Sequence, residues 1–177
     1  MEYSTQGQTA GGRYAQLQSA RSTFDREAKE SSKLTIPSLI PESTTGTRAK
    51  IKTPFQAVGA RGVNSLASKL LFALLPPSTA FFKLSIDSLE LLKQGQEGLE
   101  TEIDKGLRTI ETALMNEIEI SNDRVAMFEA LKHLIVGGNV LLYLTDDGLK
   151  VYPLSKFVCK RDAVGNILEI ITKESVN

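Results

Sequence analysis

Residues 53–87 read TPFQAVGARGVNSLASKLLFALLPPSTAFFKLSID, and this stretch sets the expected order of the fold. Thr53 can cap a helix, and Pro54 suits its first turn, where a missing N–H costs nothing. Apolar and small residues then recur every three or four positions, which is helical periodicity: Phe55, Val58, Gly62, Leu66, Leu70 and Leu74. The run from Leu66 to Leu75 is almost entirely apolar, so we expect this central helix to be buried on more than one side.

The end of the central helix and the element after it follow from the same stretch. Pro76-Pro77 ends the helix, because proline cannot donate the next backbone hydrogen bond and disfavours a helical residue before it. The run Phe81–Ile86 then predicts a strand. The helix carries no set of charged side chains that could form a catalytic centre, so the stretch indicates a structural scaffold.

Two segments precede the central helix. Residues Arg13–Lys33 predict an amphipathic helix with apolar residues close to one face: Tyr14, Leu17, Phe24 and Ala28. The segment Thr35–Lys52 contains two prolines and Gly46, which argue against regular structure. Three apolar residues can still pin its first half to a surface: Ile36, Leu39 and Ile40.

Two more helices are predicted after residue 98. The first, Leu99–Ile118, has an apolar stripe with steps of three and four residues and an acidic outer face. Ser121 or Asn122 breaks it, so the two helices should form a hairpin or kink sharply. Gly137-Gly138 ends the second helix, whose apolar stripe is Val125, Phe128, Leu131 and Ile135. We expect the central helix to pack on this second helix and the following side chains to be buried: Leu66, Leu70, Leu74, Leu131 and Ile135.

The last third of the chain changes to the period of strands. Val140–Leu144 predicts a buried strand, and Asp146-Asp147-Gly148 supplies turn chemistry for a hairpin into Leu149–Tyr152. A second hairpin is predicted between the strands Phe157–Lys160 and Ile167–Thr172. The fold class is therefore α+β, with N-terminal helices followed by an antiparallel β-meander.

Length and composition describe an ordinary globular chain of one domain, with 177 residues, 41% of them hydrophobic and 24% charged. The formal net charge is zero, so the whole chain gives no electrostatic reason to expect binding to nucleic acid. The charge is unevenly distributed: residues 1–52 and 53–86 each carry a net +3, and residues 87–124 carry a net −6. This pattern suits charge complementarity between copies or with partners, and it fits an ordinary solvated surface equally well.

No enzyme signature is present, so we expect no catalytic activity, no cofactor and no metal. The single histidine, His133, lies off the apolar stripe of its helix, and we expect it at the surface. One histidine and one cysteine, Cys159, cannot supply the usual zinc ligands. Gly59 and Gly62 are not followed by the lysine of a phosphate-binding loop and are expected to allow close helix packing. The carboxylates of the acidic helix are expected to form a solvated face.

The sequence also bears on the redox compartment of the protein and on contact with a membrane. The lone cysteine excludes a disulfide within the chain and fits a reducing compartment. The longest mostly apolar run, Leu134–Leu144, is too short to cross a bilayer, so we expect no membrane partner.

Several short segments of the sequence resemble those of one protein family. In chain order they are TIPSL at residues 35–39, TPFQAVGARG at 53–62, Asn64, LASKL at 66–70, Ala73-Leu74, FEALK at 128–132, GNVLLYL at 138–144, RDA at 161–163 and Gly165-Asn166. These segments resemble the corresponding segments of the portal proteins, or head–tail connectors, of short-tailed, autographivirus-type phages. The likeness runs from about Phe24 to Lys173 and so covers most of the chain.

The resemblance implies a structural function. It implies a homo-oligomeric ring of twelve subunits at one capsid vertex, through which double-stranded DNA is packaged and ejected and which joins head to tail. The implied partners are further copies of the chain, the major capsid protein, a scaffolding protein, a tail adaptor, terminase and DNA that passes without sequence recognition. The implied location is the head–tail junction of the virion, after assembly in the host cytoplasm.

The resemblance also implies a domain organisation. Residues 1–12 are polar and are expected to be a flexible N-terminal arm. Residues 13–177 are expected to be the N-terminal part of a portal wing domain. Because chains of that family continue much further, we expect clip, stem and crown regions beyond Asn177.

Six basic residues are candidates for contact with another subunit or with the capsid: Arg13, Arg21, Arg48, Lys50, Lys52 and Arg61. The first five are also the only group that could face DNA, and a capsid or subunit contact is favoured for them. Arg61 and Lys69 could pair with a neighbouring subunit or stay at the surface. A second class of function also stays open, that of a small α+β protein-binding adaptor that uses its acidic helix. An open sheet edge after Lys173 favours the portal, because a self-contained module would leave that edge unpaired.

Overall fold

The computed structural model describes residues 9–41, 54–77, 79–85, 99–146 and 148–174. Three of the predicted contact residues, Arg48, Lys50 and Lys52, lie outside the described residues, as does most of the expected arm. The helices are α1 (Ala10–Ala20), α2 (Ser22–Leu34), α3 (Val58–Leu74), α5 (Leu99–Ile120) and α6 (Asp123–Gly137). The strands are β1 (Leu141–Thr145), β2 (Gly148–Tyr152), β3 (Phe157–Arg161) and β4 (Ile167–Thr172), with a 3₁₀ turn at Leu154–Lys156. The order of helices before antiparallel strands confirms the α+β class.

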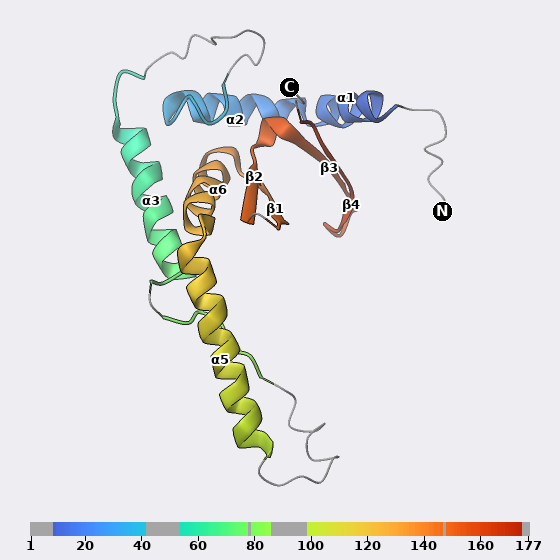
Figure 1. Cartoon of the computed structure of the whole chain (residues 1–177). Coiled ribbons are helices and arrows are strands. Elements are labelled where there is room, and N and C mark those ends of the chain that lie inside the picture. Colours follow the sequence, from blue (N-terminus) through green and yellow to red (C-terminus); the bar gives the residue numbers. More distant parts are fainter. Residues whose placement is uncertain (1–8, 42–53, 78, 86–98, 147, 175–177) are drawn as a thin grey trace.

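The helix α6 lies at the centre of this arrangement (Figure 1). It lies between α3 and the β1–β2 hairpin, and α2 crosses above all three. The long helix α5 reaches away from this group, and α6 continues beyond its end with a change of direction (Figure 1). The two helices are therefore kinked and do not form a hairpin. In the described part of the chain, no helix is long and apolar enough to span a membrane.

The four strands form two separate antiparallel hairpins, β1–β2 and β3–β4, which do not pair with each other within the described residues. Thr145 pairs with Gly148 next to the predicted turn. The φ angle of Gly148 is 116°, a conformation that glycine adopts without steric cost. The predicted pairing is confirmed, but the predicted burial of the first strand is wrong. Leu142, Tyr143 and Leu144 are exposed, because among the described elements α6 packs mainly on β2 and leaves most of β1 uncovered.

The N-terminal segment forms two helices rather than one. Thr9 accepts a hydrogen bond from Gly12 N–H and caps α1, so residues 10–12 form its first turn instead of the end of an arm. At the start of the following irregular segment, Ser32 Oγ donates to Ile36 O and accepts from Ile40 N–H. These bonds turn the chain back, and Ile40 enters a core cluster with Ala28, Leu154 and Phe157.

The packing of α3 on α6 is confirmed, but the predicted face of α3 is wrong. Val63 and Ala67 are the buried side chains, whereas Leu66 is 46% exposed and Leu74 is 53% exposed. Small residues on the buried side let the two helices pack closely, while Leu70 of the predicted stripe is half-buried and Val58 is exposed. At the start of α3, a Cβ on Gly59 would lie 2.6 Å from Leu34 O, so this glycine does allow close approach to the end of α2.

The buried face of α6 also differs from the predicted stripe. Its buried residues are Ala130, Leu131, His133, Val136 and Gly137, while Val125 is exposed. His133 is only 4% exposed, so its predicted surface position is wrong. Burial lowers the pKa of His133, and Glu129 four residues earlier partly opposes this effect. Gly138 ends the helix in the left-handed conformation, as predicted.

The predicted strand at Phe81–Ile86 is absent from its described residues, 81–85, which are irregular. Leu84 N–H donates to the Glu111 side chain on α5 at 2.6 Å. The Glu111 side chain therefore accepts the backbone hydrogen bond that a partner strand would accept if residues 81–85 formed a strand. Apolar residues in a local pattern could not reveal that none of the described strands pairs with this segment.

We predict that Leu131→Ala lowers the free energy of unfolding by about 2–5 kcal/mol, because Leu131 is buried and its truncation removes contacts and leaves a cavity. Leu134 is the matched control on the same helix, because it is 45% exposed. Leu134→Ala should cost much less, closer to about 0.5 kcal/mol. Urea unfolding followed by circular dichroism measures both, and equal losses would contradict the packing described here.

Candidate assembly surface

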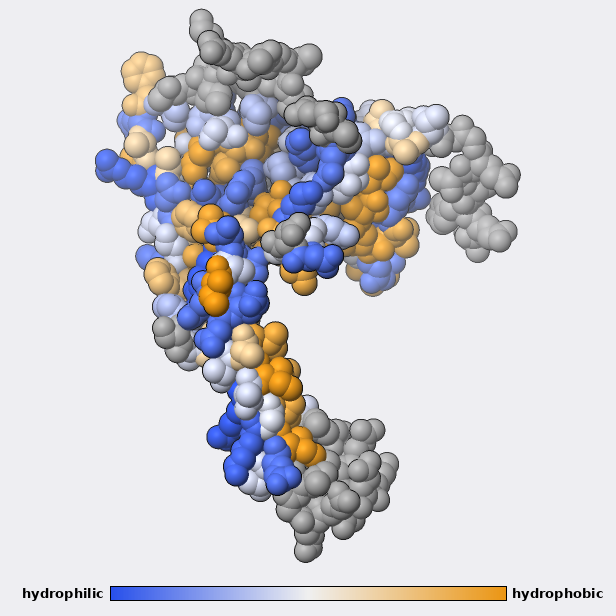
Figure 2. Space-filling view, viewed as in Figure 1, coloured by the Kyte–Doolittle hydropathy of each residue, from blue (hydrophilic) through white to orange (hydrophobic). Residues whose placement is uncertain are grey.

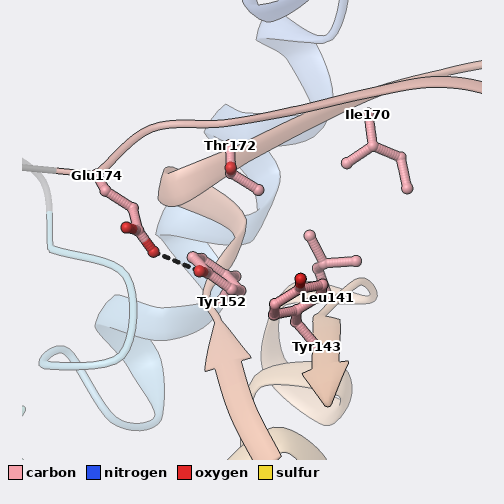
Figure 3. A pocket seen from close by; sticks show the side chains of 6 residues that line it. All are labelled: Leu141, Tyr143, Tyr152, Ile170, Thr172 and Glu174. Atoms are coloured by element: carbon pink, nitrogen blue, oxygen red, sulfur yellow. Dashed lines mark hydrogen bonds between the residues drawn. The ribbon is translucent and has the colours of Figure 1, made fainter. Parts of the chain in front are cut away.

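The first candidate site is a recess between the two hairpins (Figure 3). It has a volume of ≈ 620 Å³ and is lined by Leu141, Tyr143, Tyr152, Ile170, Thr172 and Glu174. Tyr152 donates its hydroxyl hydrogen to the Glu174 carboxylate, so the one charged group of the lining is already bound. Within the described residues, no group of His, Cys, Asp and Glu side chains could hold a metal ion. The recess therefore offers apolar and aromatic contact surface.

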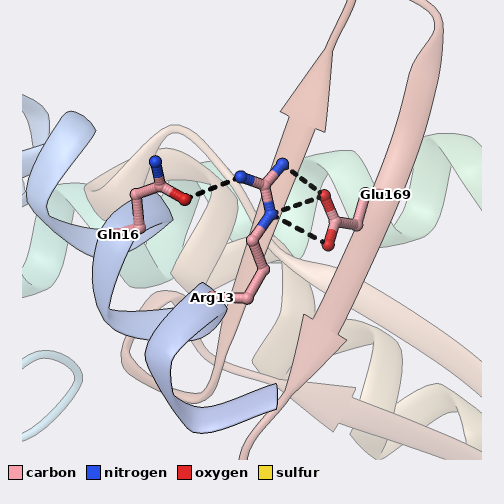
Figure 4. A network of polar contacts seen from close by, with 3 residues as sticks. All are labelled: Arg13, Gln16 and Glu169. Carbon is pink, nitrogen blue, oxygen red and sulfur yellow. Dashed lines mark hydrogen bonds and ion pairs between the residues drawn. The ribbon is translucent and has the colours of Figure 1, made fainter. Parts of the chain in front are cut away.

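The predicted contact residue Arg13 is engaged inside the chain (Figure 4). Its guanidinium donates to both carboxylate oxygens of Glu169 on β4, with the closest approach at 2.8 Å, and also to Gln16 at 2.7 Å. Both partners of the ion pair are less than one third exposed. Such a bidentate, charge-assisted pair fixes α1 against the edge of the β3–β4 hairpin.

Arg21 is likewise engaged inside the chain. Its Nη2 donates to Leu154 O at 2.7 Å, and its Nε lies 2.9 Å from Asp25 Oδ1. The guanidinium also lies 5.7 Å from the centre of the Phe157 ring. Burial raises the pKa of Asp25, and the charge of Arg21 opposes that shift. Arg21 thus joins the break between α1 and α2 to the core beneath β3.

Arg61 is the one predicted contact residue that the structure describes as exposed. It belongs to the outward side of α3, which we call the outer face of α3: Val58, Arg61, Gly62, Leu66, Lys69 and Phe72. All six are exposed. The predicted role of Arg61 in a subunit or capsid contact stays a prediction, as do those of Arg13 and Arg21.

The helix α5 presents the second unpaired apolar surface, which we call the α5 stripe: Ile103, Leu107, Ile110, Leu114 and Ile118. Ile110 is 50% exposed and Leu114 is 43% exposed. Hydrophobic residues gather along one side of the lower part of α5 (Figure 2). Contiguous exposed apolar surface of this kind is typical of protein contact sites.

Sequence reasoning missed the outer face of α3, because it assigned Leu66 and Leu74 to the core. A signal was available: the smaller residues Gly59, Val63 and Ala67 recur every four positions and mark the side on which another helix approaches closely. The α5 stripe was found from its periodicity, but that pattern could not show that much of it would stay uncovered.

We predict that α1 loosens from β4 in acid. The hydrogen bond from Arg13 lowers the pKa of Glu169 below its ordinary value. A carboxyl group with a lowered folded pKa stabilises the fold above its unfolded pKa, and this stabilisation is lost as the pH falls through the folded pKa. From about pH 4.3 downward, the protection of α1 amides against hydrogen exchange should therefore fall, after correction for intrinsic exchange.

Glu169→Gln separates this effect from general acid sensitivity. It should lower α1 protection at neutral pH and remove most of the acid dependence. Glu102→Gln is the control, because Glu102 is an exposed carboxylate on α5 and its loss should leave α1 unchanged. Unchanged α1 protection in the unsubstituted protein down to pH values well below about 4 would refute the role of this ion pair.

The chain matches a known protein family over nearly all of its length. The family model described as bacteriophage head to tail connecting protein matches residues 7–176. The chain is 42% identical over 171 residues to the portal protein of Escherichia phage T7, covering 92% of this chain and 32% of that relative. It is 42% identical over 170 residues to the portal protein of Enterobacteria phage T3, covering 92% and 31%.

A more distant relative gives the same result. The chain is 31% identical over 181 residues to the portal protein of Enterobacteria phage SP6, covering 97% of this chain and 33% of that relative. The chain thus spans about a third of the length of these curated relatives. Since the family model covers every described helix and strand, this chain belongs to the family of bacteriophage head to tail connecting proteins.

Proposed function

We propose that the full-length protein is a structural portal subunit. It forms a ring of twelve copies at one capsid vertex, and double-stranded DNA is packaged and ejected through that ring. The observation that carries this proposal is the match to portal proteins over 92% of the chain, at 42% identity to two of them. The ring also joins the head to the tail and places the protein at the head–tail junction of the virion, after assembly in the host cytoplasm.

The proposed partners follow from that position. They are further copies of the chain, the major capsid protein, a scaffolding protein, a tail adaptor and the terminase that drives DNA inward. Residues 13–177 form the N-terminal part of a wing domain in this proposal. The role is structural rather than catalytic, which fits a family described by its connection of head to tail.

The chain itself braces the ring rather than handling DNA. Helix α5 carries six acidic and two basic residues, so it repels phosphates. Two of the basic candidates for a DNA-facing group, Arg13 and Arg21, are bound to groups of the same chain. A channel that passes DNA of any sequence needs no base recognition, and we assign the channel to other parts of the full-length protein.

An independent adaptor that uses its acidic helix is the weaker proposal. The family model covers the helices and both hairpins together, and this favours one common role for the whole chain. The exposed α5 stripe could serve as a contact surface under either proposal, so it does not favour the adaptor.

Native mass spectrometry of the full-length protein tests the proposed function. We predict one dominant high-order homo-oligomer, because a contact between two different faces of a subunit closes into a ring when the rotation between copies is right. Electron microscopy of the same sample should show ring-shaped particles. A stable monomer or dimer under all conditions would exclude the portal function.

A further inference from the structure

The outer face of α3 combines exposed apolar side chains with positive charge. Arg61 and Lys69 lie on this face, and α3 contains no acidic residue. A Cβ added to Gly62 would meet no atom within 4 Å, so the middle of the face is open to a closely approaching helix. The apolar side chains around it are exposed: Val58, Leu66 and Phe72.

The α5 stripe has the opposite charge. Ile110 and Leu114 form its exposed middle. Glu117 follows Leu114 by three residues and therefore lies on the same side of the helix, and Glu102 lies beside its first half. Both glutamates are exposed. The two surfaces are therefore complementary. Each has an apolar centre, and the charged residues beside the two centres have opposite signs.

The two surfaces point in opposite directions. The buried side of α3 packs on α6, so its outer face points away from α6 and from the hairpins beyond it (Figure 1). The hydrophobic side of the lower part of α5 is on the side of the molecule that carries the hairpins (Figure 2). One copy therefore cannot join these two surfaces to each other, but two neighbouring copies can.

We propose that the outer face of α3 of one copy packs against the α5 stripe of the next copy. The occupant of each surface is then a second copy of this chain, and the contact is heterologous, since it joins two different faces. This inference rests on the proposed function for ring closure, and it adds the surfaces that meet. Charge complementarity selects this pairing, because α3 against α3 or α5 against α5 would place like charges together.

Charge reversal on α3 of the full-length protein tests the contact. Arg61→Glu with Lys69→Glu places four acidic groups at the contact in place of two basic and two acidic ones. The protein concentration at which half of the subunits are assembled should rise at least about tenfold, because juxtaposed like charges strongly oppose association. Native mass spectrometry over a dilution series measures this shift, and circular dichroism checks that the fold is kept.

A charge swap provides the rescue. Adding Glu102→Lys and Glu117→Lys to the α3 variant restores opposite charges with the two helices exchanged, so assembly should return toward the original concentration. Arg161→Glu with Lys173→Glu is the matched control, because it reverses two exposed basic residues, one at the end of β3 and one directly after β4. This control should assemble like the unsubstituted protein.

The possible results separate the two proposals. Loss with the α3 variant, rescue by the swap and no loss in the control support the α3–α5 contact. A ring that assembles equally well with Arg61 and Lys69 reversed, or a swap that rescues nothing, overturns this contact and leaves the portal function standing. An unsubstituted full-length protein that forms no ring overturns both.

Discussion

Asp123 and Arg124, adjacent residues in the first turn of α6, each bind the backbone of a different element. Asp123 Oδ1 accepts from Leu149 N–H of β2 at 2.8 Å. Arg124 donates to Leu75 O and Pro76 O, the carbonyls at the end of α3, at 2.7 and 3.1 Å. Unpaired carbonyls at a helix end need such partners. One turn of α6 therefore sets the position of α3 on one side and of the first hairpin on the other.

The C-terminal end of α6 also packs closely in this core, but apolar side chains of α3 and α5 remain exposed outside it. A Cβ on Gly137 would lie 3.0 Å from Ile40 Cδ1, so α6 also closely approaches the segment after α2. Because α6 packs on the small-residue side of α3, the outer face of α3, which includes Leu66, stays exposed. Much of the α5 stripe stays uncovered for a similar reason, since α5 reaches beyond the packed elements (Figure 1). Surfaces of this kind suit a subunit that is completed by its neighbours.

Local sequence patterns predicted the elements better than their surroundings. The turn residues around Gly148 and Gly165 and the glycines after Val136 act through their own backbone, so both hairpins and the end of α6 were predictable. The exposed side of α3, the burial of His133 and the irregular 81–85 segment depend on which neighbour is present, and periodicity carries no such information. The contacts of Arg13 and Arg21 with another subunit or the capsid stay predictions, and their bonds to Glu169 and Leu154 were not predictable, because these residues lie more than 130 positions away in sequence.

Native-state hydrogen exchange tests most directly whether α6 is the element on which the structure depends. Amides in the buried half of α6 should exchange only through global unfolding, so their free energy of opening should equal the free energy of unfolding measured with urea. Amides in the first half of α5 should open at a lower free energy. If the α6 amides exchange through local opening while those of α3 or the hairpins remain protected, the central position of α6 is contradicted.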